Sequence, residues 1–226
     1  MIRAVVFDLW NTLVHSRNGD PFQHLQRLLS PDQIRLYPQL KRDAMGRPHA
    51  SAQAFLAEWK DRLKLSPAQL GTMAEVFRTA AGDAQCFPDA VQAVLETRKL
   101  ARVALLSNTQ SFDLDFLERL DLTGLMATRI LSAEIGCLKP DPRVFETVQR
   151  RLGLFPGELA MVGDSWRDDM AGALEAGWTA VWVNRSGVPR PPHDPEAELV
   201  EIPDLAPVPR LIGNLQAGAR CGTCLG

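Results

Sequence analysis

The sequence predicts an α/β fold, in which helices cover both faces of a parallel sheet and an all-helical segment is inserted after the first strand. Residues 4–7 form an apolar, valine-rich run that leads directly to Asp8, which is typical of a buried parallel strand. Later in the chain, short apolar runs alternate with helical patterns, and this indicates parallel strands joined by right-handed crossovers. We therefore expect a core domain of residues 1–14 and 88–226 and a helical cap domain of residues 15–87.

The inserted segment begins with a polar turn at Asn18-Gly19 and contains four helical candidates. Prolines directly follow Ser30 and Ser66. Each pair marks a helix start, because serine is a preferred N-cap and proline fits the first helical turn. The helices are expected over residues 21–29, from 30 to about 40, over 49–63, and from 66 to about 80. Their apolar stripes are expected to form a small core and a docking face.

After the insert, the chain predicts a regular succession of helices and strands. Helices are expected over residues 88–98, 112–120, 143–152 and 169–176. Buried strands are expected over residues 102–106, 128–131, 159–162 and 179–183. A proline-rich stretch over residues 189–195 excludes a helix there. Beyond it we expect an edge strand over 198–202 and a last short helix over 205–215.

Composition and charge exclude several classes of protein. The chain has 226 residues, 46% of them apolar, which is enough for a sizeable core. It carries 25 basic and 27 acidic side chains, with a net charge of −2, so no basic surplus points to nucleic acid or to an anionic membrane. No apolar run reaches the ~18 residues of a membrane span. The N-terminus leads straight into a strand without a signal-like segment, and we expect a cytoplasmic protein.

The cysteines do not predict a metal or redox site. Cys86 and Cys137 stand alone in the sequence and are expected to be free thiols or small core residues. Cys221 and Cys224 form a CxxC pair at the C-terminus, but no second pair accompanies it, and a zinc site needs more ligands. We expect this tail to have no function.

Polar residues that could bind a ligand or take part in catalysis follow several of the predicted strands. Asp8 follows the first strand, Ser107 the second and Asp164 the fourth, while Lys139 lies in a loop. Because the carboxyl ends of parallel strands meet at one edge of a sheet, ligands bind there. Each residue alone is an ordinary turn or surface residue, and Asp168 and Asp169 alone are an ordinary helix cap. Their common order on one predicted scaffold indicates a shared site.

The sequence resembles the haloacid dehalogenase (HAD) superfamily of hydrolases with a helical cap of the C1 type. The resemblance is carried by Phe7-Asp8-Leu9-Trp10-Asn11-Thr12-Leu13, Leu105-Leu106-Ser107-Asn108-Thr109, Leu138-Lys139-Pro140-Asp141 and Val162-Gly163-Asp164-Ser165-Trp166-Arg167-Asp168-Asp169, which are similar to the four motifs of that superfamily in order. It extends over about residues 4–186. The resemblance implies a Rossmann-like three-layer core with a parallel sheet.

The resemblance also implies an activity, a metal-dependent phosphatase that acts on a small phosphorylated molecule. Asp8 would be the nucleophile and would form an aspartyl-phosphate. Lys139 and Ser107 would bind the charge of the phosphoryl group. Mg²⁺ would be the cofactor, because it takes few carboxylates and keeps other oxygen ligands. The implied metal ligands are Asp8, Asp164, the main-chain carbonyl of Trp10 and Asp169, with Asp168 as the alternative to Asp169.

The resemblance further implies that Trp10, Asn11, Thr12 and Asn108 contact the substrate. Trp10 departs from the phosphatase pattern, since phosphatases of the superfamily usually carry a second aspartate at this position, which protonates the leaving alcohol. Its loss would remove roughly 10²–10⁴ in rate. The enzyme would then be slow, would act on good leaving groups such as acyl phosphates, or would use another residue, for example His15 or a cap side chain.

Trp10 leaves two other readings open. The 2-haloacid dehalogenases of the superfamily also carry an aromatic residue there, and they need neither acid nor metal. They lack the Gly-Asp of the fourth motif, however, which this chain has as Gly163-Asp164. A relative that binds a phosphorylated ligand or a protein without catalysis is the remaining alternative.

The cap sequence follows no motif that identifies the substrate. Arg17, Lys41, Arg42 and Arg47 could meet an anionic substrate, but solvated surface charges are the more common case. The oligomeric state is not readable from the sequence.

Overall fold

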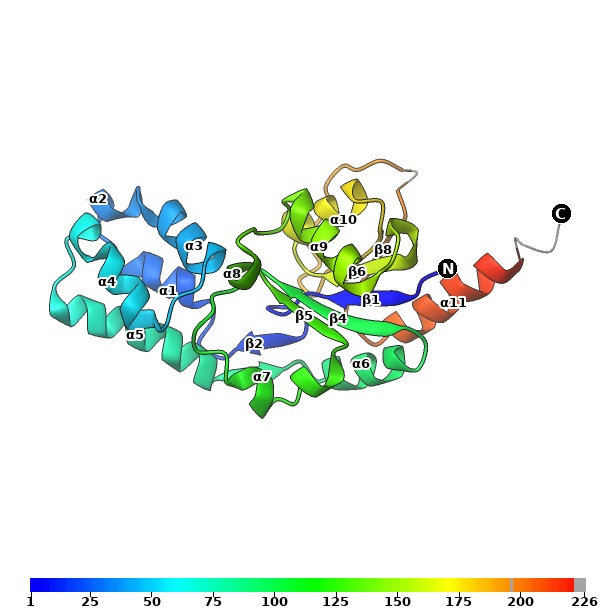
Figure 1. Cartoon of the computed structure of the whole chain (residues 1–226), viewed down its shortest axis with the longest axis horizontal. Coiled ribbons are helices and arrows are strands. Elements are labelled where there is room, and N and C mark those ends of the chain that lie inside the picture. Colours follow the sequence, from blue (N-terminus) through cyan, green and yellow to red (C-terminus); the bar gives the residue numbers. More distant parts are fainter. Residues whose placement is uncertain (196, 222–226) are drawn as a thin grey trace.

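The computed structural model describes residues 1–195 and 197–221, and a six-stranded parallel sheet lies at its centre (Figure 1). The strands follow the order β5-β4-β1-β6-β7-β8 across the sheet. β1 is therefore flanked on both sides, and Phe7 at its end pairs with Leu105 of β4 and Val162 of β6. The bounds are β1 Ala4–Phe7, β4 Arg102–Ser107, β5 Thr128–Leu131, β6 Leu159–Gly163, β7 Thr179–Val183 and β8 Leu199–Ile202. The predicted α/β class is confirmed.

Helices cover both faces of the sheet, which explains why β1 is apolar at every position. Val5 and Phe7 pack into one core cluster, and Ala4 and Val6 into the other, all without measurable exposure. Side chains alternate between the faces of a strand, so a strand buried on both sides needs a continuous apolar run. Figure 1 shows one helical layer on each side of the strands. The layers contain α6 Ala90–Arg98, α7 Phe116–Arg119 and α11 Val208–Cys221 on one side and α9 Pro142–Leu152 and α10 Gly172–Glu175 on the other.

A second group of helices lies at one end of the molecule and has its own apolar core. We call them the cap helices: α1 Pro21–Leu28, α2 Pro31–Ile34, α3 Tyr37–Gly46, α4 Ala52–Leu63 and α5 Pro67–Gly82. Their apolar core contains a cluster of aromatic rings. In it, Phe55 and Phe77 both pack against Phe112, which lies in the segment that follows β4. The cap helices are thus held against the segment that follows β4.

The sequence predicts an insert that is helical throughout, and this is wrong at its two ends. β2 Val14–Ser16 and β3 Ala84–Cys86 pair as an antiparallel ribbon at its two ends. Val14 and Ala84 are fully buried in the core cluster of the sheet. The ribbon therefore joins the cap helices to the sheet through two neighbouring crossings.

Other helices differ from the prediction in their bounds. The helix expected from residue 30 to about 40 is split into α2 and α3, because Pro38 is tolerated in the first turn of a helix but not in its interior. The helix expected over residues 112–120 is shortened to α7, since Asp113 adopts a left-handed φ of 53°. Short helical turns complete the fold: η1 Thr123–Leu125, α8 Ser132–Ile135, η2 Pro156–Glu158 and η3 Trp166–Ala171.

The C-terminal helix is longer than expected and reaches Cys221. The C-terminal tail with Cys224, for which no function is expected from the sequence, lies outside the described residues. Within residues 1–195 and 197–221, no helix combines the length and the apolar character that a bilayer crossing requires.

Candidate active site

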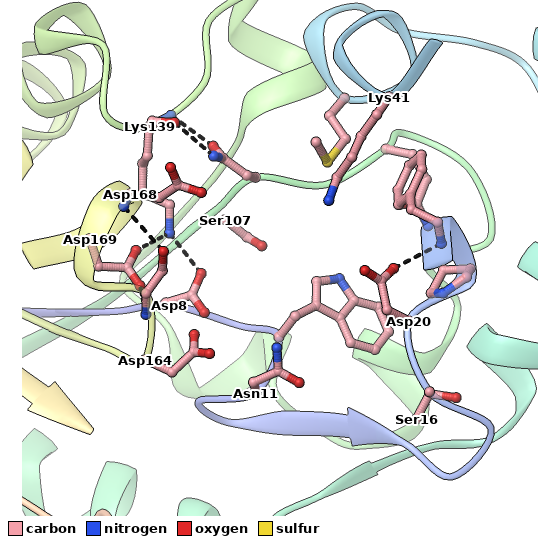
Figure 2. A pocket seen from close by; sticks show the side chains of 18 residues that line it. Asp8, Asn11, Ser16, Asp20, Lys41, Ser107, Lys139, Asp164, Asp168 and Asp169 are labelled. Carbon is pink, nitrogen blue, oxygen red and sulfur yellow. Dashed lines mark hydrogen bonds and ion pairs between the residues drawn. The ribbon is translucent and has the colours of Figure 1, made fainter. Parts of the chain in front are cut away.

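Side chains from three strand ends and one loop converge on a cavity of about 310 Å³ between the sheet and the cap helices (Figure 2). Asp8 directly follows β1, and its N–H still bonds to the Val162 carbonyl of β6 at 2.9 Å. Ser107 ends β4, and Asp164 follows the end of β6. Lys139 reaches the same cavity from the loop between α8 and α9. The parallel arrangement therefore brings together residues more than a hundred positions apart.

Lys139 lies between two carboxylates inside the protein. Its Nζ donates to Asp8 Oδ1 at 2.7 Å, to Asp169 Oδ1 at 2.5 Å and to the Leu106 carbonyl at 3.1 Å, and the residue is only 4% exposed. Burial alone lowers the pKa of this ammonium group, but the charges of Asp169 and Asp8 outweigh burial and raise it above its ordinary value. Lys139 is therefore a fixed positive charge at the end of β1.

Asn108 holds the backbone of Lys139 in place. Its side chain accepts a hydrogen bond from the Lys139 N–H at 2.8 Å and donates one to the Lys139 carbonyl at 2.9 Å. The sequence predicts a substrate contact for Asn108. Asn108 does line the cavity, but its amide is engaged with the protein.

Thr12 connects the two aspartates at the ends of β1 and β6. Its hydroxyl donates to Asp8 Oδ2 at 3.1 Å and accepts from the Asp164 N–H at 3.1 Å, and the residue is fully buried. Burial and the neighbouring Asp8 charge raise the pKa of Asp164 to about 7. Thr12 does not belong to the cavity lining. The sequence predicts a substrate contact for Thr12, and in the structure its hydroxyl is bonded to the two aspartates instead.

Asp169 is buried whereas Asp168 is half-buried, and both belong to an irregular helical turn. Residues 166–171 form a π-helical turn, a feature often found at functional sites, where the sequence predicts an ordinary helix from Asp169. Asp169 Oδ2 accepts from the Ser165 N–H at 3.0 Å, and its other oxygen bonds to Lys139. A Cβ on Gly163 would lie 2.3 Å from Asp169 Oδ2. The Gly-Asp sequence at the end of β6 thus leaves room for this carboxylate.

Three carboxylates form a candidate cation site. One oxygen each from Asp8, Asp164 and Asp169 lie within 4.8 Å of one another. Burial, partly offset by Lys139, and the Asp8 charge also raise the pKa of Asp169 to about 7. Three hard oxygen donors that repel one another at this distance are the donor set that suits Mg²⁺. Both Asp169 oxygens already accept hydrogen bonds, and the half-buried Asp168 lines the cavity beside it, with a pKa raised by burial.

Ser107 and Trp10 form further parts of the cavity wall. The Ser107 hydroxyl is buried and has no hydrogen-bond partner among the described residues, so a ligand oxygen would satisfy it. Trp10 Nε1 donates to Thr109 Oγ1 at 3.2 Å, and its ring packs 5.1 Å from Phe116. Asn11 also lines the cavity, in the left-handed conformation with φ of 61°.

The cap helices and the segment before them supply further cavity residues, of which only Lys41 was considered from the sequence, as a side chain that could meet an anionic substrate. Asp20 and Lys41 are the charged ones, and the others are Ser16, Gly19, Pro21, Phe22 and Met45. Asp20 precedes Pro21 at a helix start, which is a recognisable capping signal but carries no sign of a ligand. His15, considered as a replacement acid, packs on Phe87 at 4.7 Å and is not part of the described cavity lining.

Comparisons with known proteins give the family. A model of haloacid dehalogenase-like hydrolases matches residues 2–177. The phosphoserine phosphatase of Thermus thermophilus is 34% identical over 142 residues, which cover 62% of this chain and 54% of that protein. The (S)-2-haloacid dehalogenase 4A of Burkholderia cepacia is 28% identical over 209 residues, which cover 83% and 85%. A 2-haloacid dehalogenase structure from Pseudomonas syringae pv. Tomato DC3000 has a TM-score of 0.70 at 23% identity, covering 95% of this chain and 99% of that one.

These likenesses differ in what they establish. At 23% identity, the structural likeness shows the fold alone. The chain spans about half the length of the phosphatases that it matches. Phosphatases and a dehalogenase both occur among the relatives, so membership of the family alone does not decide which bond the enzyme breaks.

Proposed function

The chain belongs to the haloacid dehalogenase-like hydrolase family, and on that premise we propose that it is a Mg²⁺-dependent phosphatase of small phosphorylated metabolites. The observation that carries the proposal is the charge arrangement at the ends of β1 and β6. Three carboxylate oxygens lie within 4.8 Å of one another, and a single buried ammonium group contacts two of these residues. A reaction of a phosphate dianion needs a cation at this place, whereas displacement of a halide does not.

Asp8 is the proposed nucleophile. Lys139 donates to its Oδ1 and Thr12 to its Oδ2, so the carboxylate is fixed in orientation beside the cavity. One oxygen of Asp8 would attack the phosphorus atom while the bond from phosphorus to the ester oxygen breaks, and the alcohol would leave with a proton from the solvent. Water would then attack the phosphorus of the aspartyl-phosphate, releasing inorganic phosphate and restoring the Asp8 carboxylate.

The phosphoryl group would be held by residues that are otherwise incompletely satisfied. The Ser107 hydroxyl would donate to one phosphoryl oxygen, since it has no partner in the described part of the chain. Lys139 would contribute its positive charge from a dry site, where electrostatic stabilisation is strong. When bound to Asp8, Asp164, the Trp10 carbonyl and Asp169 or Asp168, Mg²⁺ would neutralise the charge that develops during transfer.

Trp10 sets the expected rate. The indole has no acidic proton to give to a leaving alcohol, and its Nε1 is already bonded to Thr109. General acid catalysis contributes roughly 10²–10⁴ in rate, so we expect slow turnover of alkyl phosphates and faster turnover of esters with good leaving groups. The relatives named as phosphatases are named for phosphoserine, glyceraldehyde 3-phosphate and N-acylneuraminate 9-phosphate, which are all small phosphorylated compounds.

A dehalogenase is the second candidate, and Trp10 is the observation that favours it. A relative named as a 2-haloacid dehalogenase also covers more of the chain than the phosphatases do. That reaction would use Asp8 to displace halide and would need no acid. It gives no reason, however, for Asp164 to lie within 4.8 Å of Asp8 and Asp169.

One assay separates the candidates. We expect phosphate release from an aryl phosphate with Mg²⁺, loss of that release with EDTA, and no halide release from a 2-haloacid. The Asp8→Asn variant should lose about 10³-fold or more in kcat, whereas Asp61→Asn, an exposed acid in α4, should match the parent. Metal-independent halide release would establish the dehalogenase instead. Absence of both products would leave a binding protein and overturn the proposed function.

A further inference from the structure

The cavity has a second end, formed by the cap, that carries two opposite charges. Figure 2 shows the Lys41 ammonium group and the Asp20 carboxylate on the side of the cavity opposite Lys139, Asp169 and Asp8. Both residues line the cavity and both are half-buried. Lys41 comes from α3, and Asp20 directly precedes α1. These two side chains are the charged contribution of the cap to the described cavity lining.

Neither side chain forms an ion pair with a described residue, although burial raises the pKa of Asp168 and the Lys41 charge is among those that lower it. Asp20 Oδ1 accepts a hydrogen bond from the Phe22 N–H at 2.8 Å, but no ion pair of Asp20 is found among the described residues. The Lys41 ammonium lies 5.4 Å from the Phe22 ring centre and makes no described hydrogen bond or ion pair. The two groups do not pair with each other although they face the same space. Arg47, at the C-terminal end of the same helix as Lys41, differs, since it pairs with Asp43 and Glu58.

A third polar group of the cap end is also unsatisfied. The Ser16 hydroxyl lines the cavity and is buried without a described hydrogen-bond partner. Buried polar groups normally have hydrogen-bond partners. The attraction between a half-buried charge and a counter-charge is stronger when the bound ligand excludes water from the site. A ligand with one positive and one negative group would satisfy Asp20 and Lys41 together. A ligand with only one charge would leave the other side chain unpaired.

Resting on the proposed phosphatase function, we propose that the cavity takes phosphate esters of small amino acids. The phosphoryl group lies at the Asp8 end, the α-ammonium group pairs with Asp20, and the α-carboxylate pairs with Lys41. The cavity of about 310 Å³ has room for a ligand with a short carbon chain, and at Lys41 it adjoins a larger pocket of about 970 Å³. Lys41 and Asp20 thus select the substrate and take no part in the transfer itself.

Substrates that lack one charged group test the two contacts separately. Phosphoserine carries both groups, phosphoethanolamine lacks the carboxylate, and 3-phosphoglycerate lacks the ammonium group. Charge-assisted contacts that strengthen transition-state binding change kcat/KM by about 10- to 100-fold. We therefore expect kcat/KM for phosphoserine to exceed that for either of the other compounds by about this factor.

Two variants assign the contacts to residues. Lys41→Gln should lower the kcat/KM ratio of phosphoserine to phosphoethanolamine by about 10- to 100-fold. Asp20→Asn should lower the ratio of phosphoserine to 3-phosphoglycerate by a similar factor, and asparagine retains the helix cap. The matched controls are Arg42→Gln, the exposed neighbour of Lys41, and Asp32→Asn, an exposed acid in α2. Both controls should keep the two ratios within about twofold of the parent.

The outcomes distinguish this inference from the proposed function. One outcome is that the protein releases phosphate from an aryl phosphate and yet shows no higher kcat/KM for phosphoserine than for phosphoethanolamine and 3-phosphoglycerate. In that case the inference is wrong, and the proposed phosphatase function still holds. If Lys41→Gln lowers kcat/KM equally for all three compounds, Lys41 binds the phosphoryl group and the inference is likewise wrong. If no phosphate is released from any ester, the proposed function fails and the inference fails with it.

Discussion

The two ends of the cavity handle charge in opposite ways. At the sheet end, Lys139 contacts Asp8 and Asp169, and Thr12 and Ser165 satisfy further carboxylate oxygens. At the cap end, Asp20 and Lys41 have no described ion-pair partner. The first arrangement is held rigid by the protein before any ligand arrives, whereas the second leaves its charges for a ligand. Preorganised charge favours a chemical step, and unpaired charge favours selection among ligands.

Burial explains why the two ends differ. Lys139 and Asp169 are almost fully buried, and an unpaired charge at that depth would strongly destabilise the fold. Lys41 and Asp20 are half-buried, so water can solvate them when the cavity is empty. The same chain can therefore tolerate unsatisfied charge at the cap end but not at the sheet end.

The largest expected effect compares the two lysines. Lys139→Met leaves Asp8 and Asp169 buried without their counter-charge, so we expect the free energy of unfolding to fall by about 3–5 kcal/mol. Lys41→Met removes a half-buried charge that forms no ion pair with a described residue, and we expect a change within about 0.5 kcal/mol. Urea denaturation measures both. Equal losses in the two variants would contradict the contrast between a paired and an unpaired end.

The second effect concerns the boundary between the two ends. Trp10→Asp would introduce a carboxyl group that can protonate the leaving alcohol, and we expect kcat for alkyl phosphates to rise by about 10- to 100-fold. The gain should be small for aryl phosphates, because their leaving groups need little protonation. Trp10→Phe, which keeps a ring near Phe116, is the control and should show no gain. A flat rate in a folded Trp10→Asp variant would contradict the missing-acid argument.

The sheet end was largely predictable from the sequence because strands and loops fix it. Asp8, Ser107 and Asp164 each follow a recognisable buried strand, and parallel pairing alone brings strand ends together. Thr12 and Asn108 were harder to interpret, since a motif gives their position but not their partners. The structure engages both side chains with the protein. Residues 166–171 form a π-helical turn, in which each hydrogen bond spans one residue more than in an α-helix. The spacing of apolar residues in the sequence does not resolve this difference.

The cap end was not predictable, for a different physical reason. Lys41 reaches the cavity because the cap helices pack against the segment after β4, where Phe112 meets Phe55 and Phe77. This docking depends on side chains far apart in the sequence. The ribbon of β2 and β3 likewise forms between residues 14–16 and 84–86, and each strand is too short for a periodic signal. Local patterns identified helices but not the face that they turn to the sheet.

The smallest expected effect separates the two roles of Asp20. Its carboxylate caps α1 through the Phe22 N–H, so Asp20→Ala should lower the free energy of unfolding by about 0.5–2 kcal/mol, whereas Asp20→Asn should keep it nearly unchanged. Ser51→Ala removes the equivalent cap of α4, where the Ser51 hydroxyl accepts from the Ala54 N–H at 3.0 Å, and should destabilise the protein similarly without altering the substrate ratios. Thermal unfolding and the ratios for phosphoserine are measured on all three variants. A substrate effect in Ser51→Ala would mean that cap stability, and not the Asp20 charge, controls selection at this end of the cavity.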